Sequence, residues 1–182
     1  MASKDLPSPE VLRQLLRYEP DTGKLFWRER GPEWFDGSLH HQRKWNGRFA
    51  GAECFRASGE FGHRYGTILA RKYRAHRIAW AIATGRWPES EIDHINCVPH
   101  DNRLCNLREA SRSENQRNTP IRRDNTSGAK GVSWSRGMRK WHVYIAKDRK
   151  RTTVGYFVDL EEASKAYAKA SAELHGEFGR TS

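Results

Sequence analysis

The chain has 182 residues with a formal net charge of +11 and a sequence pI of about 9.9, which favours a polyanion as its partner. Because the N-terminus is polar and no apolar run is long enough to cross a membrane, we expect neither a signal peptide nor a membrane partner. Its three cysteines, an odd number, favour a reducing intracellular compartment over a secreted disulfide scaffold. Seven tryptophans among the 36% hydrophobic residues allow small packed cores.

The N-terminal third begins with a predicted helix at 8–18, in which Leu12 and Leu15 share one side. A strong turn signal at 19–23 separates this helix from a predicted strand at 24–28. Residues 31–66 are rich in glycine, histidine and aromatic side chains. For that stretch we expect irregular loops and short strands.

A strand and a helix are predicted before the most informative part of the chain. The strand covers 64–69, and the helix runs from about 72–76 to Thr84, with Gly85 as its C-terminal breaker. His76 lies in the first part of this helix. We expect His76 to pack or hydrogen-bond against the following segment rather than to bind a ligand.

The segment 92–118 combines an acid-histidine pair with several asparagines. Its pattern predicts a strand at 92–95, a loop, a returning strand at 106–110 and a helix. The helix start is signalled by a capping box, with Ser111 at the cap and Glu114 reaching back. A strand-strand-helix unit of this kind can bring Asp93, His94 and Asn115 to one small site.

These side chains suit metal-assisted hydrolysis of a phosphodiester. Asp93 offers a carboxylate and Asn115 an amide oxygen, which are the ligands that a hard cation takes. His94 titrates near neutral pH and can take a proton from the attacking water. Asn106 has enough donors and acceptors to tie the loop backbone across the hairpin.

The ordered run from Asp93 to Asn115 resembles the HNH (ββα-metal) nucleases, in particular the small phage and homing endonucleases. The resemblance implies an α+β fold with a ββα-metal core at about 90–119, inside a domain spanning 1–124. It implies that Asp93 and Asn115 bind the metal, that His94 is the general base and that Asn106 is the central asparagine. The helix before the motif, and the Tyr-x-Pro-x-Thr-Gly motif that begins at Tyr18, also resemble the corresponding segments of these proteins.

One departure concerns the loop after Asn96. Relatives usually carry a tight Asn-Gly-Asp turn there. In this chain Cys97 follows the asparagine, and more residues separate Asn96 from the next acidic residue, Asp101. Cys97, His100 and Cys105 offer donors for a structural zinc ion. No fourth ligand and no Cys-x-x-Cys pair accompany them, so we interpret the difference as loop variation.

A polar stretch at 117–127 is predicted to be a linker in which Arg117, Arg122 and Arg123 can contact phosphates. Strand patterns follow at 131–134, 140–145 and 150–157. Asp159 has the position of an N-cap, and the helix after it has one apolar side with an expected end at Gly176. We predict a three-stranded antiparallel sheet packed on one helix.

This second module, assigned to 125–182, resembles the plant Apetala-two/ethylene-response-factor DNA-binding domain through its Gly-Val-x-Trp, Lys-Trp and Gly-x-Phe motifs. The resemblance implies that the sheet enters the major groove of DNA. Ser133 and Ala146 stand where arginine is usual, so the sequence preference does not carry over. The implied DNA-binding residues are Lys130, Ser133, Ser135, Arg136, Tyr144, Lys147, Arg149 and Arg151.

Together these observations predict a metal-dependent endonuclease that acts on double-stranded DNA with one Mg²⁺ or Mn²⁺ ion per active site. A monomer would nick one strand, and a homodimer or two successive events would break both. The resemblance further implies a phage-encoded protein that acts inside the bacterial host. The alternative is a catalytically inactive DNA-binding transcriptional regulator; an RNA-binding or structural basic protein would explain the charge but not the site.

Overall fold

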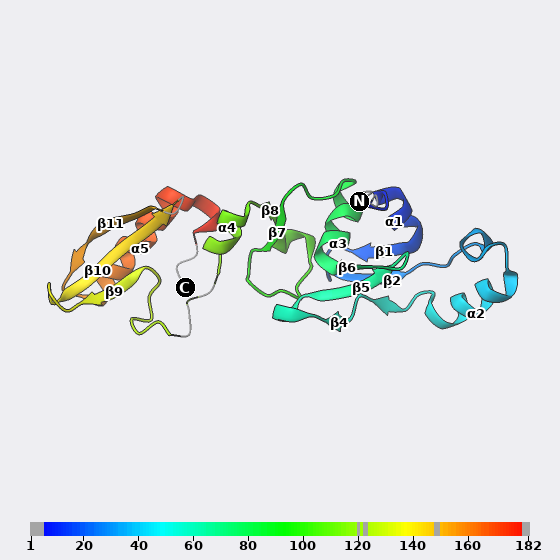
Figure 1. The fold of residues 1–182 in the computed structure, drawn as a ribbon, viewed down its shortest axis with the longest axis horizontal. Coiled ribbons are helices and arrows are strands. Elements are labelled where there is room, and N and C mark those ends of the chain that lie inside the picture. The colour runs from blue at the N-terminus through cyan, green and yellow to red at the C-terminus, as the bar shows by residue number, and fades with distance from the viewer. Residues whose placement is uncertain (1–5, 120, 122–123, 148–149, 180–182) are drawn as a thin grey trace, which may run out of the picture. The chain divides into compact units, whose positions relative to one another are not determined.

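The computed structural model of the chain describes residues 6–119, 121, 124–147 and 150–179. The chain divides into two compact units, Met1–Glu109 and Ala110–Ser182, which we describe separately (Figure 1). The fold mixes helices with several small antiparallel sheets, as the predicted α+β class requires. The domain boundary that the sequence suggests, between residues 124 and 125, lies further along the chain and stays a prediction.

The first unit is built from short elements. In chain order these are α1 Pro9–Leu15, β1 Leu16–Glu19, β2 Lys24–Trp27, the 3₁₀ turn η1 Pro32–Phe35, α2 Leu39–Phe49, β3 Glu53–Cys54, β4 Ala57–Ser58, η2 Glu60–Gly62, β5 Arg64–Ile68, β6 Arg71–Arg74, α3 Ala75–Thr84, β7 Glu91–His94, η3 Leu104–Asn106 and β8 Leu107–Ala110. Its sheets have the strand orders β1-β2-β3, β4-β5-β6 and β7-β8.

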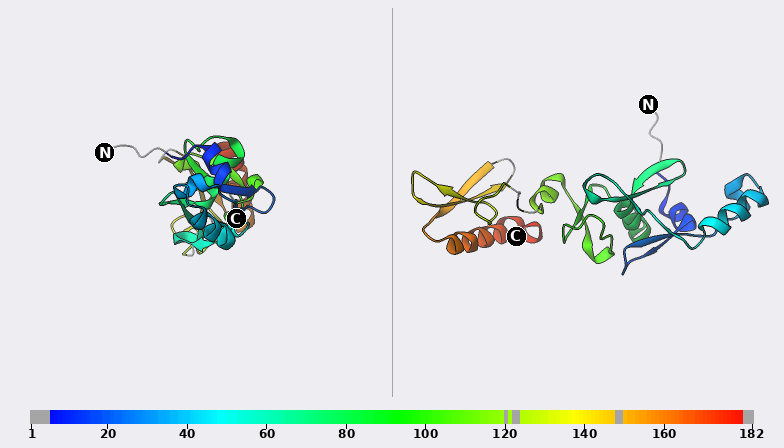
Figure 2. Two further views of the ribbon diagram at one scale, coloured as in Figure 1. Left: turned by 90° about the vertical axis from the view of Figure 1, so that its right-hand side faces the viewer. Right: turned by 90° about the horizontal axis from the view of Figure 1, so that it is seen from below.

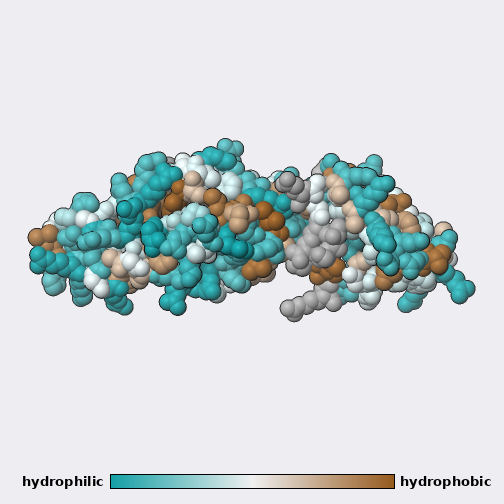
Figure 3. Space-filling model, turned by 180° about the vertical axis from the view of Figure 1, so that it is seen from behind, coloured by the Kyte–Doolittle hydropathy of each residue, from teal (hydrophilic) through white to brown (hydrophobic). Residues whose placement is uncertain are grey.

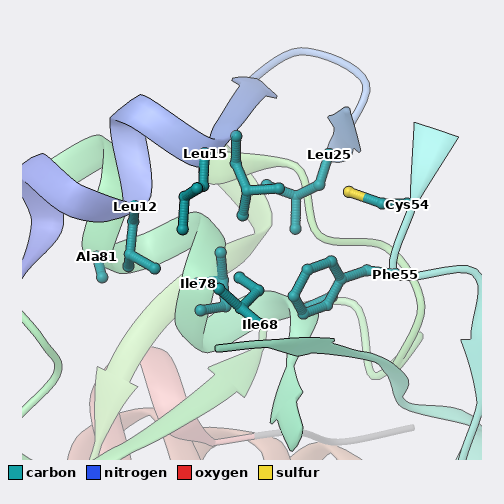
Figure 4. Packing of buried hydrophobic residues seen from close by; sticks show 10 residues of the cluster. Leu12, Leu15, Leu25, Cys54, Phe55, Ile68, Ile78 and Ala81 are labelled. Carbon is teal, nitrogen blue, oxygen red and sulfur yellow. The ribbon is translucent and has the colours of Figure 1, made fainter. Parts of the chain in front are cut away.

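The core of the first unit lies where α1 and α3 pack against the small sheets (Figure 4). Leu12 and Leu15 of α1 and Ile78 of α3 are fully buried there. Phe55 and Ile68 approach the same cluster from the sheet side (Figure 4). A second, smaller cluster of Ala79, Ile92 and Leu107 joins α3 to β7 and β8. The core therefore fixes α3 and β7, which carry two of the histidines in the site described below.

One predicted helix is shorter than its sequence pattern suggests. The pattern at 8–18 continues past Leu15, but Leu16 leaves the helix and pairs with Trp27 in the β1–β2 hairpin. Strand β6 at 71–74 pairs with β5, and α3 begins directly after it at Ala75, within the predicted start at 72–76. The predicted helix end is confirmed, because Gly85 caps α3 in the left-handed region with φ of +76°.

The helix α2 is missing from the sequence prediction, which expects only loops and short strands there. Ser38 caps α2 by accepting a hydrogen bond from the His41 backbone N–H at 3.3 Å. None of its residues is buried, so no apolar periodicity marks the helix. Trp45 instead packs edge-on against Trp27, and Cζ of the Arg30 guanidinium lies 3.9 Å from the centroid of the Trp45 ring.

The second unit contains the predicted sheet and helix. Its elements are α4 Arg112–Arg117, β9 Val132–Ser135, β10 Lys140–Lys147, β11 Lys150–Phe157, α5 Leu160–His175 and η4 Gly176–Phe178. The antiparallel sheet has the order β11-β10-β9, and α5 packs along one of its faces (Figure 2). Val143 and Ile145 on β10 meet Ala163 and Tyr167 on α5 in a buried core.

The surface agrees with the basic, polar composition. Hydrophilic side chains cover much of the face of each unit that Figure 3 shows. Within the described ranges, no helix has the length and apolar character needed to span a bilayer.

Candidate active site

Strand β7 carries the acid-histidine pair in a buried position. Ile92, Asp93 and His94 are each at most 5% exposed. Ile92 packs against Ala79 and Leu107 in the apolar cluster, and this packing fixes the position of β7. Two polar, ionisable neighbours are thus held in the protein interior, where burial is costly unless partners are provided.

The partner of Asp93 is Arg108 on the neighbouring strand β8. Both Nη2 and Nε of Arg108 donate to Asp93 Oδ2, at 2.8 and 2.9 Å. The side chains are 14% and 4% exposed, respectively, so the ion pair is largely shielded from water. A buried pair of this kind holds a carboxylate in place, and removal of either partner is strongly destabilising.

His94 is oriented by Asn102. The distance from His94 Nε2 to Asn102 Oδ1 is 3.2 Å, and both side chains are buried. An amide oxygen only accepts hydrogen bonds, so this contact favours the tautomer with the proton on Nε2 and the basic lone pair on Nδ1. Burial lowers the pKa of His94, and the hydrogen bond that His94 donates to Asn102 opposes that shift only in part.

The loop that supplies Asn102 is braced from the N-terminal hairpin. Tyr18 Oη donates to the Asn102 carbonyl at 2.7 Å, and the Leu104 N–H donates to the Pro20 carbonyl at 3.0 Å. Gly23 has φ of +71°, and a Cβ at this position would lie 2.5 Å from the backbone nitrogen of Arg103. Only glycine therefore fits against this loop, and the β1–β2 turn becomes part of the support for His94.

Asn106 closes the same loop from its other end. Its Oδ1 accepts from the Asn96 N–H at 2.9 Å, and its Nδ2 donates to the Asp101 carbonyl at 2.8 Å. The Asp101 carboxylate binds Arg103 and the Asn96 amide, and the Arg103 guanidinium holds the pKa of Asp101 well below its usual range. Cys97, which follows Asn96 in this loop, adopts φ of +58°.

A cluster of three histidines surrounds the inner side of the site. The ring of His94 lies 5.1 Å from that of His76 and 5.5 Å from that of His63, measured between centroids. His76, which we expected to pack or hydrogen-bond, is 3% exposed, and its Nδ1 has no hydrogen-bond partner among the described residues. Burial, followed by the nearby charges, lowers the pKa of His76 to about 2, so this ring is neutral.

Comparisons with known proteins match this chain to one family and to one curated phage protein. Residues 73–117 match the HNH endonucleases. The chain is also 36% identical over 108 residues to Protein 3.8 of Escherichia phage T7, a span covering 59% of this chain and 88% of the relative. The chain belongs to the HNH endonuclease family. No solved structure matches it.

The matched HNH segment runs from β6 through α4 and includes every residue of the predicted site. Its last member, Asn115, lies half-buried on α4 in the second unit. The predicted capping box of this helix is confirmed: the Glu114 N–H donates to Ser111 Oγ at 3.3 Å, and the Ser111 N–H donates to Glu114 Oε2 at 2.8 Å. Thus α4 begins where the sequence pattern places it.

Four residues predicted to bind DNA lie on one face of the second unit. In the strand register, Ser133 pairs with His142, and Arg151 pairs with Ala146. Side chains alternate along a strand, so these positions lie opposite the buried Val143 and Ile145 and away from α5. The four residues on this outer face are Ser133, Ser135, Tyr144 and Arg151.

The other predicted DNA-binding residues are distributed differently. Lys130 Nζ donates to the backbone carbonyls of Arg117 and Thr119 at 2.6 and 2.8 Å, so its ammonium already binds within the protein. Arg117 Nη2 donates to Ser113 Oγ at 2.9 Å, whereas Arg136 and Lys147 have exposed side chains. The remaining predictions, Arg122, Arg123 and Arg149, lie outside the described residues.

Sequence reasoning missed three residues around the HNH site. The sequence pattern assigns no role to Arg108, although its place on the returning strand could have suggested pairing with Asp93. Asn102 likewise receives no role from the sequence pattern. His63 lies far upstream in a region without regular periodicity, and no sequence signal connects it with His94. Cys97, His100 and Cys105, whose sequence we interpreted as loop variation rather than a zinc site, are not among the grouped metal-binding side chains found in the described part of the chain.

Proposed function

We propose that this HNH family member hydrolyses phosphodiester bonds in double-stranded DNA with a divalent cation. The observation that carries the proposal is the buried His94, whose tautomer Asn102 sets, next to an Asp93 that Arg108 holds in place. A buried base and a fixed carboxylate at adjacent positions are costly to a folded chain. Catalysis would explain why the chain keeps both.

The residues have separate roles in this proposal. His94 Nδ1 takes a proton from a water molecule, whose oxygen attacks the phosphorus as the bond from phosphorus to the 3′ oxygen breaks. The products are a 5′-phosphate and a 3′-hydroxyl, whose proton comes from solvent. Asn102 keeps the imidazole oriented, and Asn106 holds the intervening loop. Arg108 is a positioning residue, because it acts through Asp93.

The predicted ligands fit a hard cation. Asp93 provides a carboxylate and Asn115 an amide, and oxygen donors of these types suit Mg²⁺ or Mn²⁺. The role of Asn115, which lies in the second unit, rests on its place in the sequence pattern and within the matched family segment. When bound, the cation would neutralise charge on the scissile phosphate and on the leaving oxygen.

The second unit would supply additional affinity for DNA, in the manner of an Apetala-two-like sheet. The outer face of its sheet presents the Arg151 guanidinium 4.9 Å above the Tyr144 ring. On the same face His142 stacks on Tyr156 with centroids 4.8 Å apart. Cationic and planar groups on an open face suit contacts with phosphates and bases. The T7 relative supports a phage-encoded protein that acts inside a bacterial host.

The cleavage test uses supercoiled plasmid and the full chain. In Mg²⁺ or Mn²⁺ we expect relaxed circles, and EDTA should abolish the reaction. A ligase should reseal the nicks without prior end repair, because the ends are a 5′-phosphate and a 3′-hydroxyl. Normal DNA binding with no cleavage in either metal ion would instead favour the inactive regulator.

The module test compares DNA affinity over a range of salt concentrations. Arg151→Ala should weaken binding and reduce the slope of log K against log salt by about one, because one phosphate contact is lost. Arg136→Ala, at another exposed position predicted to bind DNA, tests a second contact in the same way. Unchanged affinity and slope in both variants would remove the sheet from the DNA interface.

A further inference from the structure

The histidine cluster brings together side chains from three separate parts of the first unit. His63 directly precedes β5, His76 lies in the first turn of α3, and His94 ends β7. One candidate ligand nitrogen from each ring lies within 4.8 Å of the others. Imidazole is the commonest metal ligand in proteins, and three of them facing one point form the protein part of a tetrahedral site.

The ring nitrogens within the cluster are unusual for a protein interior. The Nδ1 atoms of His63 and His76 are both buried, and neither has a hydrogen-bond partner among the described residues. Most buried polar atoms in folded proteins have such a partner, so two orphan atoms in one cluster require an explanation. A bound cation would satisfy both lone pairs at once.

The donor set selects the class of ion. Nitrogen ligands suit Zn²⁺, Co²⁺, Ni²⁺ and Cu²⁺, whereas Mg²⁺ and Ca²⁺ prefer oxygen. Zinc-nitrogen bonds of about 2.0–2.1 Å imply nitrogen-nitrogen separations of roughly 3.4 Å in a tetrahedral site. The cluster, with ligand atoms within 4.8 Å of one another, is therefore nearly closed around an ion. Small ring rotations would complete it, with water as the fourth ligand.

We propose that His63, His76 and His94 form a binding site for Zn²⁺ or a similar transition-metal ion, separate from the oxygen-ligand site for Mg²⁺. Since His94 is also the general base of the proposed nuclease, an ion at this site would occupy the base and block cleavage. This inhibitory consequence rests on the proposed function, whereas binding of the ion does not. The site would make DNA cleavage sensitive to free transition-metal ions.

The binding test uses the metal-stripped full chain titrated with Co²⁺. We expect one equivalent of Co²⁺ to produce the visible absorption of tetrahedral nitrogen-ligated cobalt, and Zn²⁺ to displace it. His63→Gln and His76→Gln should each weaken binding by more than about tenfold. His100→Gln, at an exposed histidine on the neighbouring loop, is the matched control and should bind normally. Equal binding by wild type and both cluster variants would overturn the proposal.

A second variant guards against loss of folding, because His76 is buried. His63→Cys replaces an imidazole on the half-buried member with a thiol. It should still bind Co²⁺ and add a thiolate-to-cobalt charge-transfer band. A charge-transfer band already present in wild type would mean that Cys97 or Cys105 holds the ion, which would also overturn the proposal.

The inhibition test adds Zn²⁺ to cleavage reactions that contain Mg²⁺. We expect Zn²⁺ to stop cleavage by wild type, and to reduce whatever cleavage His63→Gln retains only at more than about tenfold higher concentration. Cleavage in Mg²⁺ without histidine-dependent cobalt binding would refute the metal site and leave the nuclease standing. Histidine-dependent cobalt binding by a chain that never cleaves DNA would refute the nuclease and leave the metal site.

Discussion

Arg108 binds Asp93 through two nitrogens that share a single carboxylate oxygen, at 2.8 and 2.9 Å, across neighbouring strands of the smallest sheet. This ion pair explains how the chain keeps an acid at a position only 4% exposed. It also makes the acid dependent on a residue to which the sequence pattern assigned no role.

The ion pair predicts strong coupling between its members. Arg108→Met and Asp93→Asn should each lower the free energy of unfolding by about 3–5 kcal/mol, because each leaves a buried group without its partner. The double variant should lose much less than the sum of the two. Urea denaturation of the four proteins measures the coupling, and additive losses would contradict it.

The loop between β7 and β8 should depend on the Asn106 amide. Asn106→Ala removes two hydrogen bonds to loop backbone and should cost about 2–3 kcal/mol of stability. Amide hydrogen exchange at Asn96 should accelerate, because its acceptor is lost. Asn106→Asp, which keeps an acceptor for Asn96 but loses the donor to Asp101, should exchange more slowly at Asn96 than the alanine variant. Equal protection in all three proteins would contradict this role.

Cys97 should be a site where a smaller residue stabilises the protein. Its φ of +58° is costly for a side chain with a Cβ, and glycine adopts it readily. Cys97→Gly should therefore raise the free energy of unfolding by up to about 1 kcal/mol. Cys97→Ala keeps the strain and serves as the control. A glycine variant no more stable than the alanine variant would show that the strain is absent.

The extent to which the sequence predicted the fold depended on how local each signal was. The capping box at Ser111 and the glycine at Gly85 act within one helical turn. The start of α4 and the end of α3 lie where these two signals predict them. Leu16 lies in a helical pattern but is drawn into the β1–β2 hairpin by strand pairing, which is a nonlocal effect. The exposed helix α2 has no apolar periodicity to reveal it.

The candidate site shows the same division. The sequence pattern predicts a strand that carries Asp93 and His94, and both residues lie on β7. The residues that bind these two side chains could not be predicted from the sequence. The contact of Arg108 with Asp93 depends on the pairing of β7 with β8, and the contact of Asn102 with His94 depends on how the loop folds back. His63 reaches the site only through the packing of three separate segments, which no spacing along the chain records.

Stability should fall in acid because His76 is buried as a neutral ring. Burial, and then the charges of His94, His63, Arg74 and Arg77, lower the pKa of His76 from 6.5 to about 2. Between these values the unfolded chain binds a proton that the folded chain excludes, so unfolding becomes easier as the pH falls below about 6.5. The expected slope from this group is about 1.4 kcal/mol per pH unit.

The measurement is urea denaturation in metal-free buffer at several pH values below and above 6.5. His76→Gln should show a shallower loss of stability in acid than wild type. His63 and His94, whose pKa values are also lowered, account for part of the remaining slope. Parallel curves for the two proteins would mean that His76 is not held neutral by the fold.

The most direct test of the nuclease is the single-turnover rate of DNA cleavage in saturating Mg²⁺, with wild type, His94→Ala and His100→Ala compared at equal DNA occupancy. His100 is an exposed histidine on the loop that follows β7 and controls for a general loss of charge or fold. Loss of the general base should slow His94→Ala by about 10²–10⁴-fold, while His100→Ala cleaves at the wild-type rate. Cleavage by His94→Ala as fast as by wild type would contradict the account.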